Sequence, residues 1–189
     1  MKNEQNYDFR KELLTVHEKN IRNFSRTPKA DEHLLADGTK ISIASNASEV
    51  ISVAAEDFCD YLSVSMGVKA SVVTEGKGDI TIRLASDVGV DLGGFAAYKG
   101  FRVETDKDGI VITAHDDRGA QQALFYIEDL MTFAHAPVIA YGKIEKRAMY
   151  TSFSGLITGA SSRQRTALRL STRFPRASPF LLPSKWARF

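Results

Sequence analysis

The sequence predicts an α+β fold, in which a mixed β-sheet carries two helices on one face, with an additional N-terminal helix and an irregular basic C-terminal tail. Two apolar runs between residues 101 and 114 alternate with polar side chains around a turn, as in a half-buried hairpin. Apolar residues then recur at helical spacing from Ala120 to Met131. A strand followed by another helical stretch stands further upstream. Because only one crossover contains a helix, a wholly parallel sheet is excluded.

The hairpin and the helix after it form the centre of the expected fold. We expect strands at residues 101–105 and 110–114, with Gly109 in the left-handed conformation that closes the loop between them. Either Asp116 or Asp117 can cap the next helix, because both are strong N-cap residues. That helix is expected over residues 117–133.

A strand at residues 40–44 and a helix at 49–66 are expected upstream. Asn46 is the N-cap candidate, with Glu49 three residues on, and Gly67 stands where the helix ends. Strands at 70–74 and 79–84 follow, and then a loop at 85–99. We expect a core formed by two helical stripes and the hairpin: Val50, Ala54, Phe58 and Leu62; Leu124, Ile127 and Met131; Val103, Ile110 and Ile112.

An N-terminal helix is expected over residues 7–24, because Phe9, Leu13, Val16, Ile21 and Phe24 lie near one face. Pro28 ends it, since the residue before a proline is disfavoured in helical conformation. We interpret His17 as a structural histidine on the surface of this helix.

Composition bounds the class of protein. The 189 residues suffice for one domain with tails, and the 43% hydrophobic fraction supports a core rather than disorder. No run of 18 apolar residues occurs, and the first twenty residues are polar, so we expect neither a membrane span nor a secretory signal. The single cysteine, Cys59, fits a reducing compartment and packs as a small apolar residue. A cytoplasmic location is therefore expected.

The net charge of +2 conceals a split between body and tail. From residue 156 to 189 there are seven basic residues and no acidic one. Subtracting from totals of 25 basic and 23 acidic residues leaves 18 and 23 for residues 1–155, a net charge of −5.

The side chains that carry chemistry do not form a recognisable site. Neighbours on a helix diverge by about 100°, so the acid pairs 56–57 and 128–129 cannot face one substrate. The pair Asp116-Asp117 is interpreted as a helix cap. His17, His33, His115 and His135 lack metal-ligand spacing, and Gly93-Gly94 lacks the context of a phosphate loop. We therefore predict no catalytic, cofactor-binding or metal-binding residue.

Four short motifs follow one another in the second half of the body: Gly100-Phe101, Gly109-Ile110-Val111-Ile112, Asp117-Arg118-Gly119-Ala120 and Ala123-Leu124-Phe125-Tyr126-Ile127-Glu128. With the segments upstream of them, their order from residue 37 to 155 resembles the non-catalytic domain that precedes the catalytic barrel in family 20 β-hexosaminidases and α-glucuronidases. The resemblance implies an accessory domain that packs beside a barrel and has no activity of its own.

Four regions follow from this resemblance: an N-terminal helical segment (1–36), the accessory domain (37–145), the start of a missing catalytic (β/α)8 barrel (146–155) and the basic tail (156–189). A barrel needs about 200 residues or more, which the tail does not supply. A frameshift after codon 155 would explain the abrupt rise in arginine, serine and proline. We expect the surface meant for the barrel to favour self-association.

Two alternatives remain. The chain is a free-standing carbohydrate-binding or protein-interaction module, with Phe95, Tyr98 and Tyr126 as sugar platforms, although core packing is the favoured account of these aromatics. In the other alternative, the basic tail binds nucleic acid, but no nucleic-acid-binding motif accompanies it.

Overall fold

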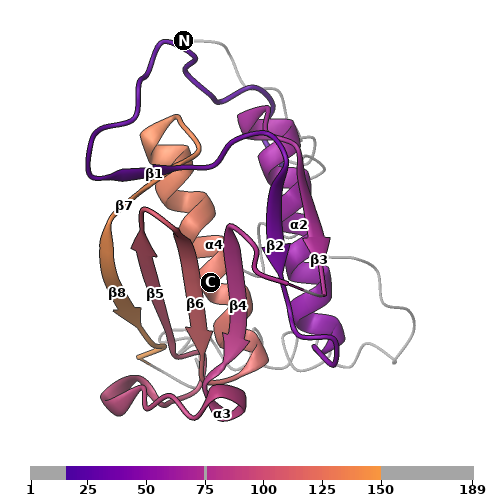
Figure 1. Ribbon diagram of the computed structural model, residues 1–189, viewed down its shortest axis with the longest axis vertical. Helices are drawn as coiled ribbons and strands as arrows, with labels where there is room; N and C mark the ends of the chain where they lie inside the picture. Colours follow the sequence, from indigo (N-terminus) through magenta and orange to yellow (C-terminus); the bar gives the residue numbers. More distant parts are fainter. Residues whose placement is uncertain (1–15, 75, 150–189) are drawn as a thin grey trace, which may run out of the picture.

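The computed structural model describes residues 16–74 and 76–149, which form a mixed six-stranded sheet with α2 and α4 packed together on one of its faces (Figure 1). The predicted α+β class is confirmed. Among the described residues, no helix is both long and apolar enough to cross a membrane. The elements are β1 (Glu32–Leu34), β2 (Thr39–Ser42), α2 (Glu49–Met66), β3 (Ala70–Val73), β4 (Ile80–Leu84), α3 (Ala85–Val88), η1 (Gly93–Phe95), β5 (Phe101–Asp106), β6 (Gly109–Ala114), α4 (Asp117–Ala134), β7 (Val138–Ala140) and β8 (Gly142–Lys146).

The sheet has the order β3-β2-β4-β6-β5-β8. Its first four strands run parallel to one another, and β5 is antiparallel to both β6 and β8. A separate antiparallel pair joins β1 to β7. The carboxyl ends of β2, β4 and β6 therefore meet at one edge of the sheet, close to α3 (Figure 1).

The predicted hairpin is present as β5 and β6, with Asp106 opposite Gly109. Gly109 has a φ of +143°, and a Cβ atom there would lie 2.5 Å from the carbonyl oxygen of Asp79. That same oxygen accepts a hydrogen bond from Ile110 N at 2.8 Å. Glycine is needed here both for its backbone conformation and for the close approach to β4.

The predicted core is confirmed except at Val50, which is only half-buried, whereas Ile51 is 4% exposed. Four-residue steps drift around a helix of about 100° per residue, so Val50 lies about 120° from Leu62 and Ile51 only about 20° from it. The other core positions expected from the sequence are buried: Ala54, Phe58, Leu62, Val103, Ile110, Ile112, Leu124, Ile127 and Met131.

One of the predicted helix caps is wrong. The N-cap of α2 is Ser48, whose Oγ accepts from Ile51 N at 3.5 Å, and not Asn46. The cap of α4 is Asp116, which accepts from Gly119 N at 2.6 Å. The C-terminal prediction for α2 is confirmed, since Gly67 is left-handed with a φ of +62°.

The N-terminal helix is wrong over residues 16–24, which form bends and turns. Backbone amides of this segment donate to the last turn of α2: Asn20 N to Val64 O at 3.1 Å and Ile21 N to Ser65 O at 3.0 Å. These tertiary hydrogen bonds satisfy the orphan carbonyls of a helix end, and they replace the local bonds of a helix. The rest of the predicted helix, the barrel entry from residue 150 and the basic tail lie outside the described residues.

Candidate functional site

Members of the adjacent acid pairs lie in different places and make different contacts. Asp57 binds His17, and Asp116 caps α4. Glu128 is buried at 1% exposure beside the exposed Asp129. The described residues contain no group of three or more His, Cys, Asp or Glu side chains that could hold a metal ion.

His17 is buried against α2, not exposed on a helix as expected. Its Nε2 atom lies 3.1 Å from Asp57 Oδ1 and 3.8 Å from Asp60 Oδ2. Burial lowers the pKa of His17, but the hydrogen bond and charge of Asp57, with further charge from Glu128 and Asp60, outweigh it and raise the pKa above 6.5. The interaction fastens the N-terminal segment to α2, which is a structural role.

Cys59 is half-buried in α2. Burial and the nearby charge of Glu56 raise the pKa of its thiol to about 11. Since the thiolate is the nucleophilic form, the raised pKa of the thiol disfavours reaction of this cysteine at neutral pH.

The three candidate aromatic platforms belong to different elements. Phe95 is half-buried in η1, and Tyr98 is 43% exposed with Lys99 Nζ 5.3 Å from its ring centroid. Tyr126 in α4 has Lys146 Nζ 4.5 Å from its centroid. A lysine already occupies the position at which a sugar ring would stack on Tyr126.

Tyr126 contributes to a surface groove of about 210 Å³. Basic and aromatic side chains dominate the groove, and its far end is formed by the residues that follow β8. This groove, called here the exit groove, therefore lies where the described chain leaves the sheet. It is lined by Lys99, Phe101, Gln122, Phe125, Tyr126, Asp129, Lys146, Arg147 and Ala148.

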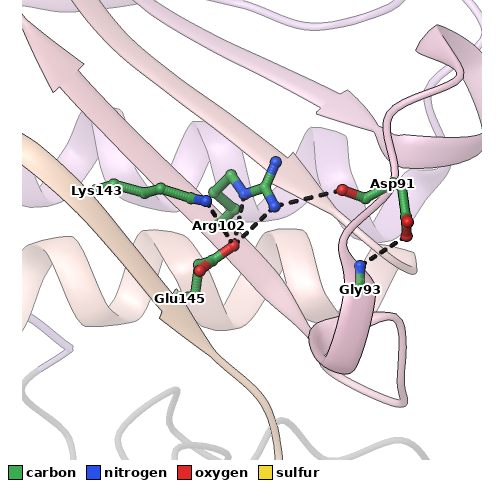
Figure 2. A network of polar contacts seen from close by, with 5 residues as sticks. All are labelled: Asp91, Gly93, Arg102, Lys143 and Glu145. Carbon is green, nitrogen blue, oxygen red and sulfur yellow. Dashed lines mark hydrogen bonds and ion pairs between the residues drawn. The ribbon is translucent and has the colours of Figure 1, made fainter.

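A polar network on the sheet face opposite α2 and α4 fixes β8 in place (Figure 2). Arg102 of β5 and Lys143 of β8 both bind the Glu145 carboxylate, at 2.7 and 3.1 Å. Hydrogen bonds from Arg102 and Lys143 hold the pKa of Glu145 below its usual value. Arg102 also donates to the carbonyl of Asp91 at 3.3 Å, and the Asp91 side chain accepts from Gly93 N at 2.7 Å.

Sequence reasoning missed this network. Alternate charges in 101–106 and 142–146 were visible, but nothing in the sequence paired the two segments. The register that places Arg102 opposite Glu145 is a contact over 43 residues, known only once β8 joins the sheet edge.

This geometry defines an α+β domain with a polar open sheet face and without a recognisable catalytic group among its described residues. Neither a protein-family model nor a curated protein sequence matches the chain. Solved structures of glycoside hydrolases share its fold. Streptomyces plicatus N-acetyl-β-hexosaminidase matches with a TM-score of 0.54 and 24% identity, over 66% of this chain and 25% of that chain. The family 20 β-N-acetylhexosaminidase from Streptomyces coelicolor A3(2) matches with a TM-score of 0.53 and 22% identity over the same shares.

The chain thus has the fold of a part of these enzymes and spans about a quarter of their length.

Proposed function

We propose that this chain is the non-catalytic accessory domain of a glycoside hydrolase and packs beside the catalytic barrel in the intact enzyme. The observation that carries the proposal is the fold match, which covers 66% of this chain but only 25% of the hexosaminidase chain. A glycosidase needs two carboxyl groups about 5–9.5 Å apart across one bond, and two of the adjacent acids are engaged elsewhere: Asp57 binds His17, and Asp116 caps α4.

Exposed apolar side chains support docking of a further domain. Phe133, near the end of α4, is 83% exposed, and Met149, just beyond β8, is 86% exposed. Asp129, which lines the exit groove, and Phe133 are both exposed and lie four residues apart on α4, so the exposed side of this helix leads from the exit groove to Phe133. A folded partner covering this face would remove the apolar surface from water.

The coding sequence after codon 155 tests the proposal first. In one reading frame we expect a continuous barrel-like sequence of about 200 residues or more. If no frame encodes one, the proposed frameshift and the barrel partner are both contradicted.

An enzyme that joins this chain to the encoded barrel then allows a test of docking. Phe133→Ser should weaken domain–barrel association in the joined enzyme while leaving the stability of this chain alone within about 0.5 kcal/mol, because the ring is exposed. Val88→Ser, at a 43% exposed position in α3, is the matched control. Thermal unfolding measures the stability of this chain alone. In the joined enzyme, hexosaminide hydrolysis during heating reports the loss of domain–barrel association. If Phe133→Ser and Val88→Ser behave alike in both measurements, docking through α4 is contradicted.

The free-standing sugar-binding module with aromatic platforms is less well supported. Lys146 stands over the Tyr126 ring, and Tyr98 packs with Lys99 in the turn between η1 and β5. The chain alone should release no chromophore from aryl hexosaminides or glucuronides. Activity that a point substitution within residues 16–149 abolishes would overturn the proposal.

A further inference from the structure

A second hollow lies at the edge of the sheet where the parallel strands end. Its volume is about 160 Å³. It is lined by the end of β4, by α3, by the start of α4 and by the segment that leads from β2 into α2: Ala44, Asn46, Ala47, Ser48, Ile51, Ile82, Arg83, Leu84, Asp87 and Asp117. We call it the strand-end pocket. No sequence motif pointed to it, because its residues come from three separate stretches of the chain, 44–51, 82–87 and 117.

The topology places this pocket where chain connections diverge. From β2 the chain passes through α2 to β3, which lies on one side of β2 in the sheet. On the other side of β2 lies β4, and β6 is the next strand beyond β4. In open sheets with parallel strands, ligands bind in the crevice outside the carboxyl ends at such a divergence. The strand-end pocket occupies that crevice.

Arg83, the basic residue of the pocket, is held in position by the neighbouring strand β6. Arg83 Nε donates to Thr113 Oγ1 at 3.1 Å, and Thr113 is fully buried in the neighbouring strand. No described residue engages the two Nη groups of Arg83 in a hydrogen bond or ion pair. The guanidinium is therefore a fixed donor with hydrogen-bonding capacity remaining.

The acidic groups of the pocket are also available. Asp116 caps α4 through Gly119 N and binds Lys99 N at 3.0 Å, so Asp117 is not needed for the cap. No described residue donates to the Asp117 carboxylate. Asp87 accepts only from its neighbour Ser86, at 3.0 Å.

This combination of groups selects the charge of a ligand. An anion would meet the carboxylates of Asp87 and Asp117. A cation would meet Arg83 and the positive ends of α2 and α4. A neutral molecule with several hydroxyl groups can accept from Arg83 and donate to both carboxylates. The pocket is smaller than the roughly 300–1,000 Å³ of sites for drug-sized ligands, so it suits one ring.

We infer that the strand-end pocket binds a single neutral sugar unit through its hydroxyl groups. This inference does not rest on docking to a barrel, because every lining residue belongs to the described domain. The expected dissociation constant is on the order of 1 mM, as for a small polar ligand of modest efficiency.

Amide chemical shifts of the full ¹⁵N-labelled chain would test the inference, with glucose, galactose and N-acetylglucosamine as probes. At least one sugar should cause saturable shifts at Ser48, Leu84 and Asp117. Asp117→Asn keeps the shape and the Asp116 cap but removes a charged acceptor, so affinity should fall roughly tenfold or more. Arg83→Gln should weaken binding similarly.

Arg118→Gln is the control, because Arg118 lies one residue beyond Asp117, is exposed and does not line the pocket. It should bind sugar as the parent chain does. Three outcomes overturn the inference: no saturable shift with any of the sugars, shifts at the pocket only with inorganic phosphate or Ca²⁺, or sugar binding unchanged in both pocket variants with native spectra. Sugar binding without any downstream barrel would leave the inference standing and contradict only the accessory role.

Discussion

Replacing Gly119 by alanine tests the joint between α4 and the hairpin. In an ordinary helix position this change stabilises by about 0.8–1.0 kcal/mol. Here, an added Cβ would collide with the carbonyl oxygen of Gly100, a backbone atom that cannot rotate away. It would also lie 3.3 Å from Asp116 Oδ1. The start of α4 must therefore move away from β5.

That movement weakens several short contacts at once. Asp116 accepts hydrogen bonds from Gly119 N at 2.6 Å and from Lys99 N at 3.0 Å, and Gly100 O accepts one from His115 N at 2.9 Å. The movement would weaken these three hydrogen bonds. A lost cap costs about 1 kcal/mol, and overpacking costs about 1–3 kcal/mol. After subtraction of the helix-propensity gain, we expect net destabilisation of about 1–3 kcal/mol.

Urea unfolding followed by circular dichroism gives the free energy by linear extrapolation. Gly94→Ala is the matched control, because no atom lies within 4 Å of its Cβ position and no positive φ restricts it. That variant should be neutral or slightly stabilising. A Gly119→Ala chain as stable as the parent, or more stable, would refute the tight joint.

Three further predictions concern the core, His17 and Cys59. Leu124→Ala should cost about 2–5 kcal/mol in urea unfolding, because Leu124 is fully buried, whereas Val50→Ala should cost clearly less at its half-buried site; equal losses would contradict the core assignment. The raised pKa of His17 makes its ion pair with Asp57 stabilise the fold fully below pH 6.5 and lose that contribution as the pH rises through the folded-state pKa. The urea midpoint of His17→Gln should therefore depend less on pH between 6 and 9 than that of the parent, and identical profiles would remove the histidine from this role. Cys59, with a pKa of about 11, should resist iodoacetamide at pH 8 until the chain unfolds, and rapid labelling of the native chain would contradict its burial.

Local patterns predicted the elements that local chemistry determines. The hairpin and both long helices follow from alternation and helical spacing, and the structure contains them. N-cap preference left Asp116 and Asp117 open, and the structure has Asp116. Segments whose conformation depends on distant partners were missed. Residues 16–24 are held by the end of α2, and β8 exists because β5 offers an open edge.

The strand-end pocket was hidden for the same reason. Arg83 and Asp87 lie in the consecutive elements β4 and α3, whereas Asp117 begins α4 about thirty residues later. Their proximity depends on the strand order, in which β2, β4 and β6 are neighbours although α2, β3 and the β5 strand separate them along the chain. A single sequence does not specify this order.

Three glycines of the sequence motifs serve backbone packing. Gly100 and Gly119 meet at the joint of β5 and α4, and Gly109 lies against Asp79 at the turn. Each permits an approach that a Cβ would block, so these three glycines serve the geometry of the fold. Similar spacing therefore implies the fold without implying an activity. Side chains outside these contacts, such as Arg83 and Asp87, are where this domain can acquire a binding function of its own, because they can change without disturbing the glycine joints.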